Sequence, residues 1–159
     1  MSRLIPTPKP NLMIIDDDPD QLGLFRITAE RTCLYWRIAT AEDGELALRQ
    51  ITAWAEELPR FVPQIVLSDV KMPRMGGIEF ARTLRHDPRL PPIHTVAMSS
   101  SQYPPEVQAA LEAGCVAFFQ KPGSFSKLTE LFQKLPGVCG LGPEADRHHG
   151  FVIESFAGA

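Results

Sequence analysis

The sequence contains no long apolar stretch, and this absence limits the kinds of protein that it can encode. No run approaches the roughly 20 apolar residues that a membrane-spanning helix requires. The opening segment, MSRLIPTPKP, lacks the apolar core of a secretory signal peptide. Lysine and arginine form no long run, so no footprint for a nucleic acid is visible. We therefore expect a protein that binds neither a membrane nor a nucleic acid directly.

Cysteine is scarce, and the three cysteines form no cluster with the spacing of metal ligands. Cys33 and Cys115 lie among apolar residues, so we expect both to be small core side chains. A chain without a disulfide framework is typical of a reducing compartment, which predicts a cytoplasmic location.

The chain is long enough for one domain with a proper core. It has 159 residues, of which 44% are hydrophobic and 22% charged, with a formal net charge of −3. Residues 1–10 carry three prolines and predict a flexible lead-in. Residues 11–135 are predicted to form the domain. Residues 136–159, rich in glycine and polar residues, are predicted to be a tail too short for an output domain.

Within residues 11–135, short apolar runs alternate with segments of helical spacing. The runs predict five buried strands, at residues 12–15, 35–40, 64–68, 95–98 and 116–120. Between them, apolar residues recur at helical intervals, as in residues 19–32 and 128–135. Five strands that alternate with helices predict an α/β fold, a doubly wound parallel sheet with helices on both faces.

Four of the five predicted strands end on a polar residue with useful chemistry. The first is followed by Asp16 and Asp17, the third by Asp69, the fourth by Ser99 and the fifth by Lys121. Ligands of such folds bind beyond the carboxyl ends of the strands. If the first and third strands are neighbours, three carboxylates converge, and a divalent cation would relieve their repulsion. Oxygen ligands without histidine or cysteine favour Mg²⁺, Mn²⁺ or Ca²⁺ over Zn²⁺.

The same residues could support phosphoryl transfer to a carboxylate. A carboxylate can act as a nucleophile towards phosphorus, and this chemistry depends on positioning and charge neutralisation. The ammonium of Lys121 and the hydroxyl of Ser99 could each contact phosphoryl oxygens. A lone aspartate after a strand is more often a helix N-cap, and we interpret Asp18 and Asp20 as capping or surface residues. The functional interpretation depends on the joint placement of the set.

The segments MIIDDDPD, IVLSDVKMPRMGG, VAMSS and AFFQKP resemble the receiver domain of two-component response regulators over roughly residues 11–135. The resemblance implies the flavodoxin-like strand order 2-1-3-4-5. It also implies that Asp69 is phosphorylated by a histidine kinase or a phosphotransfer protein, with Mg²⁺ as cofactor and Mn²⁺ as a substitute. Such a protein is not an enzyme beyond phosphorylating itself from small donors and dephosphorylating itself.

The resemblance also implies a role for each residue of the predicted site. Asp17 would bind Mg²⁺ directly and Asp16 through water, and Lys121 would pair with the phosphate. The Lys121–Pro122 peptide bond would be cis. The full set of implied metal ligands is Asp16, Asp17, Asp69 and the backbone carbonyl of Lys71.

A switch is implied at Ser99 and Phe118. Phosphorylation adds negative charge and acceptor oxygens, so Ser99 would be drawn to the phosphate and Phe118 would fill the space left behind. This would change the face formed by the fourth helix, fifth strand and fifth helix, where a downstream protein target would bind. Phe118 lacks the hydroxyl of the frequent tyrosine, which favours its inward position without phosphate.

Two further positions are implied to tune the lifetime of the phosphoryl group. Lys71 lies two residues after Asp69, and Ser101 lies two residues after Ser99. Lys71 and Arg74 could equally form a solvated basic face.

Three alternatives remain open from the sequence. The chain could be a single-domain regulator or a piece of a larger regulator or hybrid kinase. It could be a degenerate receiver that only binds partners, although every pocket residue is present. A haloacid-dehalogenase-like phosphohydrolase would use Asp16 as nucleophile and Asp18 as acid/base. In that case Pro19 would stand where that family prefers Thr or Val, and Asp69 would be unexplained.

Part of the predicted tail also has an open interpretation. His148 and His149 are adjacent, and such a pair is more often solvated than metal-binding. Residues 151–153 are apolar and could pack on the domain or on a partner.

Overall fold

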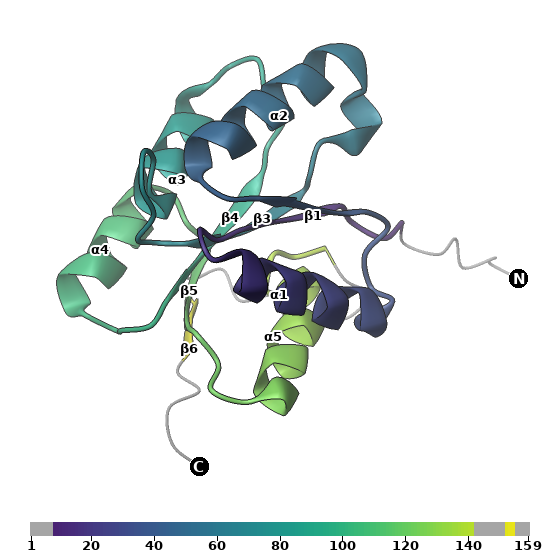
Figure 1. The fold of residues 1–159 in the computed structure, drawn as a ribbon. Coiled ribbons are helices and arrows are strands. Elements are labelled where there is room, and N and C mark those ends of the chain that lie inside the picture. The colour runs from purple at the N-terminus through teal and green to yellow at the C-terminus, as the bar shows by residue number, and fades with distance from the viewer. Residues whose placement is uncertain (1–7, 142–151, 155–159) are drawn as a thin grey trace, which may run out of the picture.

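A computed structural model of the protein describes residues 8–141 and 152–154. Strands and helices alternate along these residues (Figure 1). The strands are β1 (Leu12–Ile15), β2 (Ile38–Ala41), β3 (Ile65–Asp69), β4 (His94–Ser99), β5 (Ala117–Gln120) and β6 (Val152–Glu154). The helices are α1 (Pro19–Thr32), α2 (Gly44–Glu57), α3 (Gly77–His86), α4 (Pro104–Glu112) and α5 (Phe125–Val138), and a 3₁₀ turn covers Pro59–Phe61.

All neighbouring strands of the sheet pair in parallel, in the order β2-β1-β3-β4-β5-β6. The predicted five-stranded order 2-1-3-4-5 is therefore confirmed, with a sixth strand added beside β5. In the register between β1 and β3, Ile15 lies opposite Ser68. The segments that follow these two strands consequently begin side by side, at the carboxyl-terminal end of the sheet.

Helices cover both faces of the sheet. Leu12 and Ile14 of β1 join the core under α1 and α5, whereas Met13 and Ile15 join the core under α2 and α3 (Figure 1). This division follows from the alternation of side chains along a strand. The α1 and α5 helices contact each other through Phe25 and Phe132, whose rings meet edge to face at 6.4 Å between centroids.

Short polar side chains fix where the helices begin. Asp18 precedes α1 and accepts hydrogen bonds from its first amides, which confirms its prediction as a capping residue, and Pro19 occupies the first turn. Asp43 caps α2 and Ser124 caps α5 in the same way. Gly114 follows α4 with φ of +97°, a conformation that suits glycine and ends the helix as predicted.

The structure adds to the predicted tail. Helix α5 continues through Pro136 to Val138, and Val152–Glu154 forms β6. Residues 152 and 153 therefore lie along the domain, with Ile153 opposite Phe118 of β5. The division into lead-in, domain and tail stays a prediction. Residues 1–7, Phe151 and the pair His148 and His149 lie outside the described residues.

The cysteine prediction is partly wrong. Cys115 is buried as expected, but Cys33 is exposed and Cys139 is buried instead. Cys33 is the residue that ends α1, with a left-handed φ of +57°. The backbone turns at this residue, and the Cys33 side chain points to solvent although it has apolar neighbours in sequence.

A buried tyrosine compensates for the proline inside α5. In a regular helix the carbonyl of Phe132 would accept the amide of residue 136, but Pro136 has no N–H group. The hydroxyl of Tyr35 donates a hydrogen bond of 2.5 Å to this carbonyl instead. Burial raises the pKa of Tyr35 far above its ordinary value, so the hydroxyl keeps its proton and remains a donor. This contact joins the segment before β2 to α5.

We expect Tyr35→Phe to lower the free energy of unfolding by about 1–3 kcal/mol, because it leaves a buried carbonyl without its donor. Urea unfolding at equilibrium would measure the change. In a Pro136→Ala background, where the backbone amide returns, the same substitution should cost less. Tyr103→Phe, at an exposed position, serves as the matched control. An equal cost of Tyr35→Phe in both backgrounds would contradict the compensation.

Candidate functional site

Three carboxylates meet where β1 and β3 end. Asp16 and Asp17 follow β1, and Asp69 is the last residue of the neighbouring β3. Asp16 is fully buried, Asp69 is 7% exposed, and Asp17 is exposed. One carboxylate oxygen from each lies within 4.8 Å of the others. The structure thus brings the predicted acids together in a geometry that could hold a cation.

Lys121 reaches this acidic cluster from the segment after β5. Its Nζ atom donates hydrogen bonds to Oδ2 of Asp69 at 2.9 Å and to Oδ2 of Asp16 at 3.0 Å. A third bond, of 2.8 Å, goes to Oε1 of Gln21 in the first turns of α1. Sequence reasoning did not find Gln21, because nothing in a lone glutamine on a helix marks its direction.

The charges of this cluster act on one another. Burial raises the pKa of Asp69, and the nearby Asp16 raises it further, which together outweigh the lowering by Lys121. Burial by itself would lower the pKa of Lys121, but its bonds to Asp69 and Asp16 raise the value above the ordinary one. Lys121 therefore stays charged, while Asp69 carries a negative charge that one cation does not fully compensate.

The start of α1 holds Asp16 in place. The backbone amide of Asp18 donates to Oδ1 of Asp16 at 2.9 Å, while Oδ2 faces Lys121. The side chain of Asp18 in turn accepts hydrogen bonds from the amides of Asp20 and Gln21, as a helix cap. Each oxygen of Asp16 thus accepts a hydrogen bond, one from the backbone and one from Lys121. The side chain of Asp17, in contrast, is exposed to solvent.

A close approach of backbone shapes the floor of the site. The amide of Gly77, at the start of α3, donates to the carbonyl of Val70 at 3.0 Å. A Cβ atom at this glycine would overlap the carbonyl oxygen of Asp69 and lie 2.8 Å from Oγ of Ser68. Sequence reasoning treated this glycine only as a loop residue. Its lack of a side chain lets α3 begin directly behind Asp69.

Ser99 ends β4 beside the segment that carries Lys121. It is buried, its carbonyl accepts the amide of Lys121 at 2.7 Å, and its hydroxyl accepts the amide of Ser101 at 3.3 Å. Ser101 itself is exposed. Phe118 is not in the acidic cluster, because it lies fully buried in a core shared with Ala97 and residues of α3 and α4.

Lys71 and Arg74 lie in the loop between β3 and α3, and both expose their side chains. The Nζ atom of Lys71 is 3.8 Å from Oε2 of Glu106, in the first turn of α4. Arg74 instead pairs with the fully buried Asp43. Lys71 and Arg74 are thus exposed, as a solvated basic face would require. Each of them nevertheless faces a specific acid that the sequence did not suggest.

The implied cis bond before Pro122 is wrong for this structure. No peptide bond among the described residues is cis, and the Lys121–Pro122 bond is trans. The two isomers of a bond before proline differ by only about 0.5–1 kcal/mol, so the local sequence does not decide between them.

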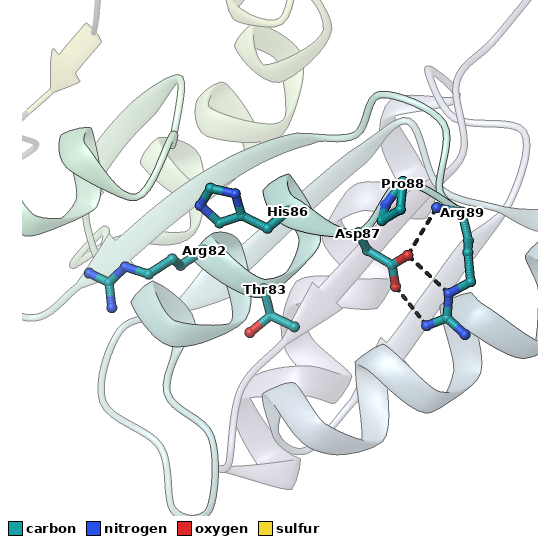
Figure 2. Close-up of a pocket in the computed structure, with 6 residues that line it drawn as sticks. All are labelled: Arg82, Thr83, His86, Asp87, Pro88 and Arg89. Carbon is teal, nitrogen blue, oxygen red and sulfur yellow. Dashed lines mark hydrogen bonds and ion pairs between the residues drawn. The ribbon is translucent and has the colours of Figure 1, made fainter.

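A surface pocket lies away from all these residues. It is lined by Arg82, Thr83, His86, Asp87, Pro88 and Arg89, at the far end of α3 (Figure 2). Because α3 begins behind Asp69 and runs away from it, this pocket lies at the edge of the sheet where β4 starts. None of the predicted site residues lines it. Separately, no helix within residues 8–141 is long and apolar enough to span a membrane.

Comparisons with known proteins agree with this geometry. A model of the response regulator receiver domain family matches residues 12–133. A response regulatory protein of Vibrio cholerae is 30% identical over 124 residues, which cover 77% of this chain and 43% of that protein. The two-component response regulator ORR3 of rice is 27% identical over 135 residues, which cover 84% of this chain and 96% of ORR3. The chain thus spans less than half of one relative and nearly all of another.

Solved structures show the same fold. The response regulator RPA3017 of R. palustris, from red light signaling, superposes with a TM-score of 0.69 at 25% identity, covering 80% of this chain and 91% of that one. The Mn²⁺-bound form of response regulator Rcp1 superposes with a TM-score of 0.67 at 18% identity, covering 80% of this chain and 92% of that one. The second likeness supports the fold alone.

An acidic cluster such as that of Asp16, Asp17 and Asp69 is typical of the Mg²⁺ site of receiver domains. The family match also leaves no place for the haloacid-dehalogenase-like alternative. Matched by the family model over most of its length, folded in the family's strand order and carrying its acidic cluster, the chain belongs to the response regulator receiver domains of two-component signalling systems.

Proposed function

We propose that this receiver domain accepts a phosphoryl group on Asp69 from a histidine kinase or a phosphotransfer protein. The observation that carries the proposal is the position of Lys121, whose Nζ atom lies 2.9 Å from Asp69 and 3.0 Å from Asp16. Receiver domains in general interact with these two classes of donor. A buried carboxylate with a raised pKa, an ammonium beside it and an open side for a donor form a site for phosphoryl transfer.

In the proposed reaction, a carboxylate oxygen of Asp69 forms a bond to phosphorus as the bond from phosphorus to the donor's histidine nitrogen breaks. The leaving imidazole keeps or gains one proton and ends neutral, and Asp69 becomes an acyl phosphate. Lys121 remains charged and can turn from the carboxylates to a phosphoryl oxygen. The hydroxyl of Ser99 can donate to another phosphoryl oxygen.

The residues present fit a hard divalent cation. Asp16, Asp17 and Asp69 offer oxygen ligands within 4.8 Å of one another, and the backbone carbonyl of Lys71 would complete the protein's set. Oxygen ligands suit Mg²⁺, with Mn²⁺ as a substitute. The bound cation would neutralise charge on the phosphoryl oxygens. Asp17, exposed and without a described ion pair, is the carboxylate most free to bind it directly.

The proposed output is a change of surface and not catalysis on another substrate. Ser99 would move to the phosphate, and Phe118, buried in this structure, would hold the inward position. A target would bind the face of α4, β5 and α5, where the aromatic side chains of Tyr103 and Phe125, before α4 and at the start of α5, are exposed. Strand β6 covers the edge of β5, so the target would meet β6 at this face.

The setting of this activity is also part of the proposal. We place the protein in the cytoplasm, where its three cysteines would stay reduced.

Incubation with acetyl phosphate and Mg²⁺ is expected to add one phosphoryl mass increment to the intact protein. Asp69→Asn should remove the increment, because the nucleophilic oxygen pair is lost, and chelation with EDTA should prevent it. Intact mass spectrometry measures each sample. An increment that survives Asp69→Asn but disappears in Asp16→Asn would contradict the assignment of Asp69. A folded wild-type protein without an increment would point to a receiver that only binds partners or accepts one specific donor.

The metal-free protein should gain stability when Asp69 loses its charge. Because the folded-state pKa of Asp69 is raised, its ionised form opposes folding above its ordinary pKa, and this penalty fades as the pH falls through the raised pKa. Asp69→Asn should raise the Tm at pH 7 by about 2–4 °C, the shift expected for about 1 kcal/mol in a chain of this size. The difference in Tm between Asp69→Asn and the wild type should become smaller at acidic pH. Addition of Mg²⁺ should raise the Tm of the wild type more than that of the variant.

Asp87→Asn is the control for that experiment. Hydrogen bonds from Arg89 hold the pKa of Asp87 at about 2, so its ionised form favours folding and its removal should lower the Tm. A metal-free Asp69→Asn protein with an unchanged or lower Tm at pH 7 would show that Lys121 already compensates the carboxylate.

Lys71 and Ser101 are expected to set the lifetime of the phosphoryl group. Lys71 lies two residues after Asp69 and Ser101 two residues after Ser99, and both are exposed, so they could help or hinder a water molecule that attacks the acyl phosphate. Exchanging the two, as Lys71→Ser with Ser101→Lys, should change the half-life measured after the donor is removed. An unchanged half-life would reject this role.

A further inference from the structure

Asp43 is a fully buried acid outside the acidic cluster. It lies between β2 and α2, and its side chain has no exposure to solvent. Oδ1 accepts the amide of Leu46 at 2.9 Å and caps α2. Oδ2 accepts Nε of Arg74 at 2.7 Å, and a second guanidinium nitrogen also contacts it. Both oxygens are therefore used, one by a helix and one by the loop between β3 and α3.

Arg74 adopts a conformation that needs outside support. Its φ is +66°, in the left-handed region that residues other than glycine and asparagine rarely occupy. The guanidinium can reach Asp43 from this conformation, and Asp43 carries the only full negative charge that contacts it within the described residues. Two nitrogens of the guanidinium contact this one oxygen, which gives a charge-assisted pair between the loop and the start of α2.

The backbone beside this pair makes a second connection to α2. The amide of Gly44 donates to the carbonyl of Met75 at 3.1 Å. A Cβ atom at Gly44 would lie 2.9 Å from both Cγ and the carbonyl oxygen of Met75, so the loop packs directly on the start of the helix. The loop is thus attached to α2 by one ion pair and one backbone hydrogen bond.

This loop is the one that carries the proposed carbonyl ligand of Lys71. It leaves β3 at Asp69, and its other end is fixed where Gly77 donates to the carbonyl of Val70 at 3.0 Å. Between these fixed ends, Arg74 and Met75 attach the loop to the start of α2, while the side chain of Lys71 faces Glu106 of α4. The contacts of Arg74 and Met75 lie three and four residues after Lys71, so they restrict the path that the loop takes away from the acidic cluster.

We propose that Asp43 is a positioning residue for the metal site, which acts through Arg74 to hold the loop so that the carbonyl of Lys71 faces the acidic cluster. The inference rests on the proposed function, because it assigns how that site is organised before the cation binds. Asp43 itself contacts no metal or substrate. Groups that orient metal ligands in this indirect way commonly change metal affinity by about 10–100-fold.

Asp43→Asn tests the ion pair while it keeps a good helix cap, because asparagine caps as well as aspartate. Arg74→Gly removes the guanidinium and also accepts the positive φ without strain. Each variant should raise the Kd for Mg²⁺, measured by calorimetric titration, by about tenfold. The double variant should bind no more weakly than either single one, since the two residues act as one unit.

A readout without metal separates positioning from stability. In the metal-free variants, amide hydrogens of residues 70–77 should exchange faster than in the wild type, while those of β1 and β4 keep their protection. Asp87→Asn is the matched control, because it removes a carboxylate held by an arginine through two contacts at the far end of α3 (Figure 2). It should leave the Kd for Mg²⁺ unchanged.

The outcomes distinguish this inference from the proposed function. A wild-type protein that binds no Mg²⁺ would overturn both. A wild type that binds it, with Asp43→Asn and Arg74→Gly binding equally well, would overturn the positioning role alone. Weaker binding in Asp87→Asn by the same factor would also overturn it, because the effect would then follow from general stability.

Discussion

The placement of one ammonium group between two buried carboxylates is the constraint on which the rest of the site depends. Asp16 and Asp69 come from neighbouring strands, and without a partner their charges would repel in a poorly solvated place. Lys121 bonds to both and also to Gln21 of α1. The compensation is incomplete, since the pKa of Asp69 remains raised. That residual negative charge favours the binding of a cation at the acidic cluster.

The sheet supplies this geometry through its connections. Because β1 pairs in parallel with β3, Asp16 and Asp69 lie together at the carboxyl-terminal end of the strands. Lys121 follows β5, two strands away from β3, and its side chain extends to both carboxylates. The loops at that end are in turn attached to helix starts, by Asp18 at α1, by Gly77 at α3 and by the pair of Asp43 and Arg74 at α2. Caps and close backbone contacts therefore serve both the fold and the site.

Strand β6 extends the sheet beside the face that we propose for target binding. A five-stranded receiver sheet would leave one side of β5 unpaired, and here Val152–Glu154 pairs with it in parallel. The β5-α5-β6 unit repeats the strand-helix-strand connection used throughout the domain. Any target that uses the face of α4, β5 and α5 thus meets a sheet whose edge is already extended.

Local patterns in the sequence determined the order of strands and helices, the resemblance to receiver domains and the candidate acids, because each depends on periodicity or on a short motif. Asp18 could be predicted as a cap for the same reason. Only the tertiary structure decided that Gln21 shares Lys121, that Tyr35 replaces the amide missing at Pro136, and that Asp43 faces Arg74. Each of these contacts joins residues that are 31 to 100 positions apart along the chain, and no local pattern encodes their direction. Cys33 shows the same limit, since a left-handed turn exposes a side chain with apolar neighbours in sequence.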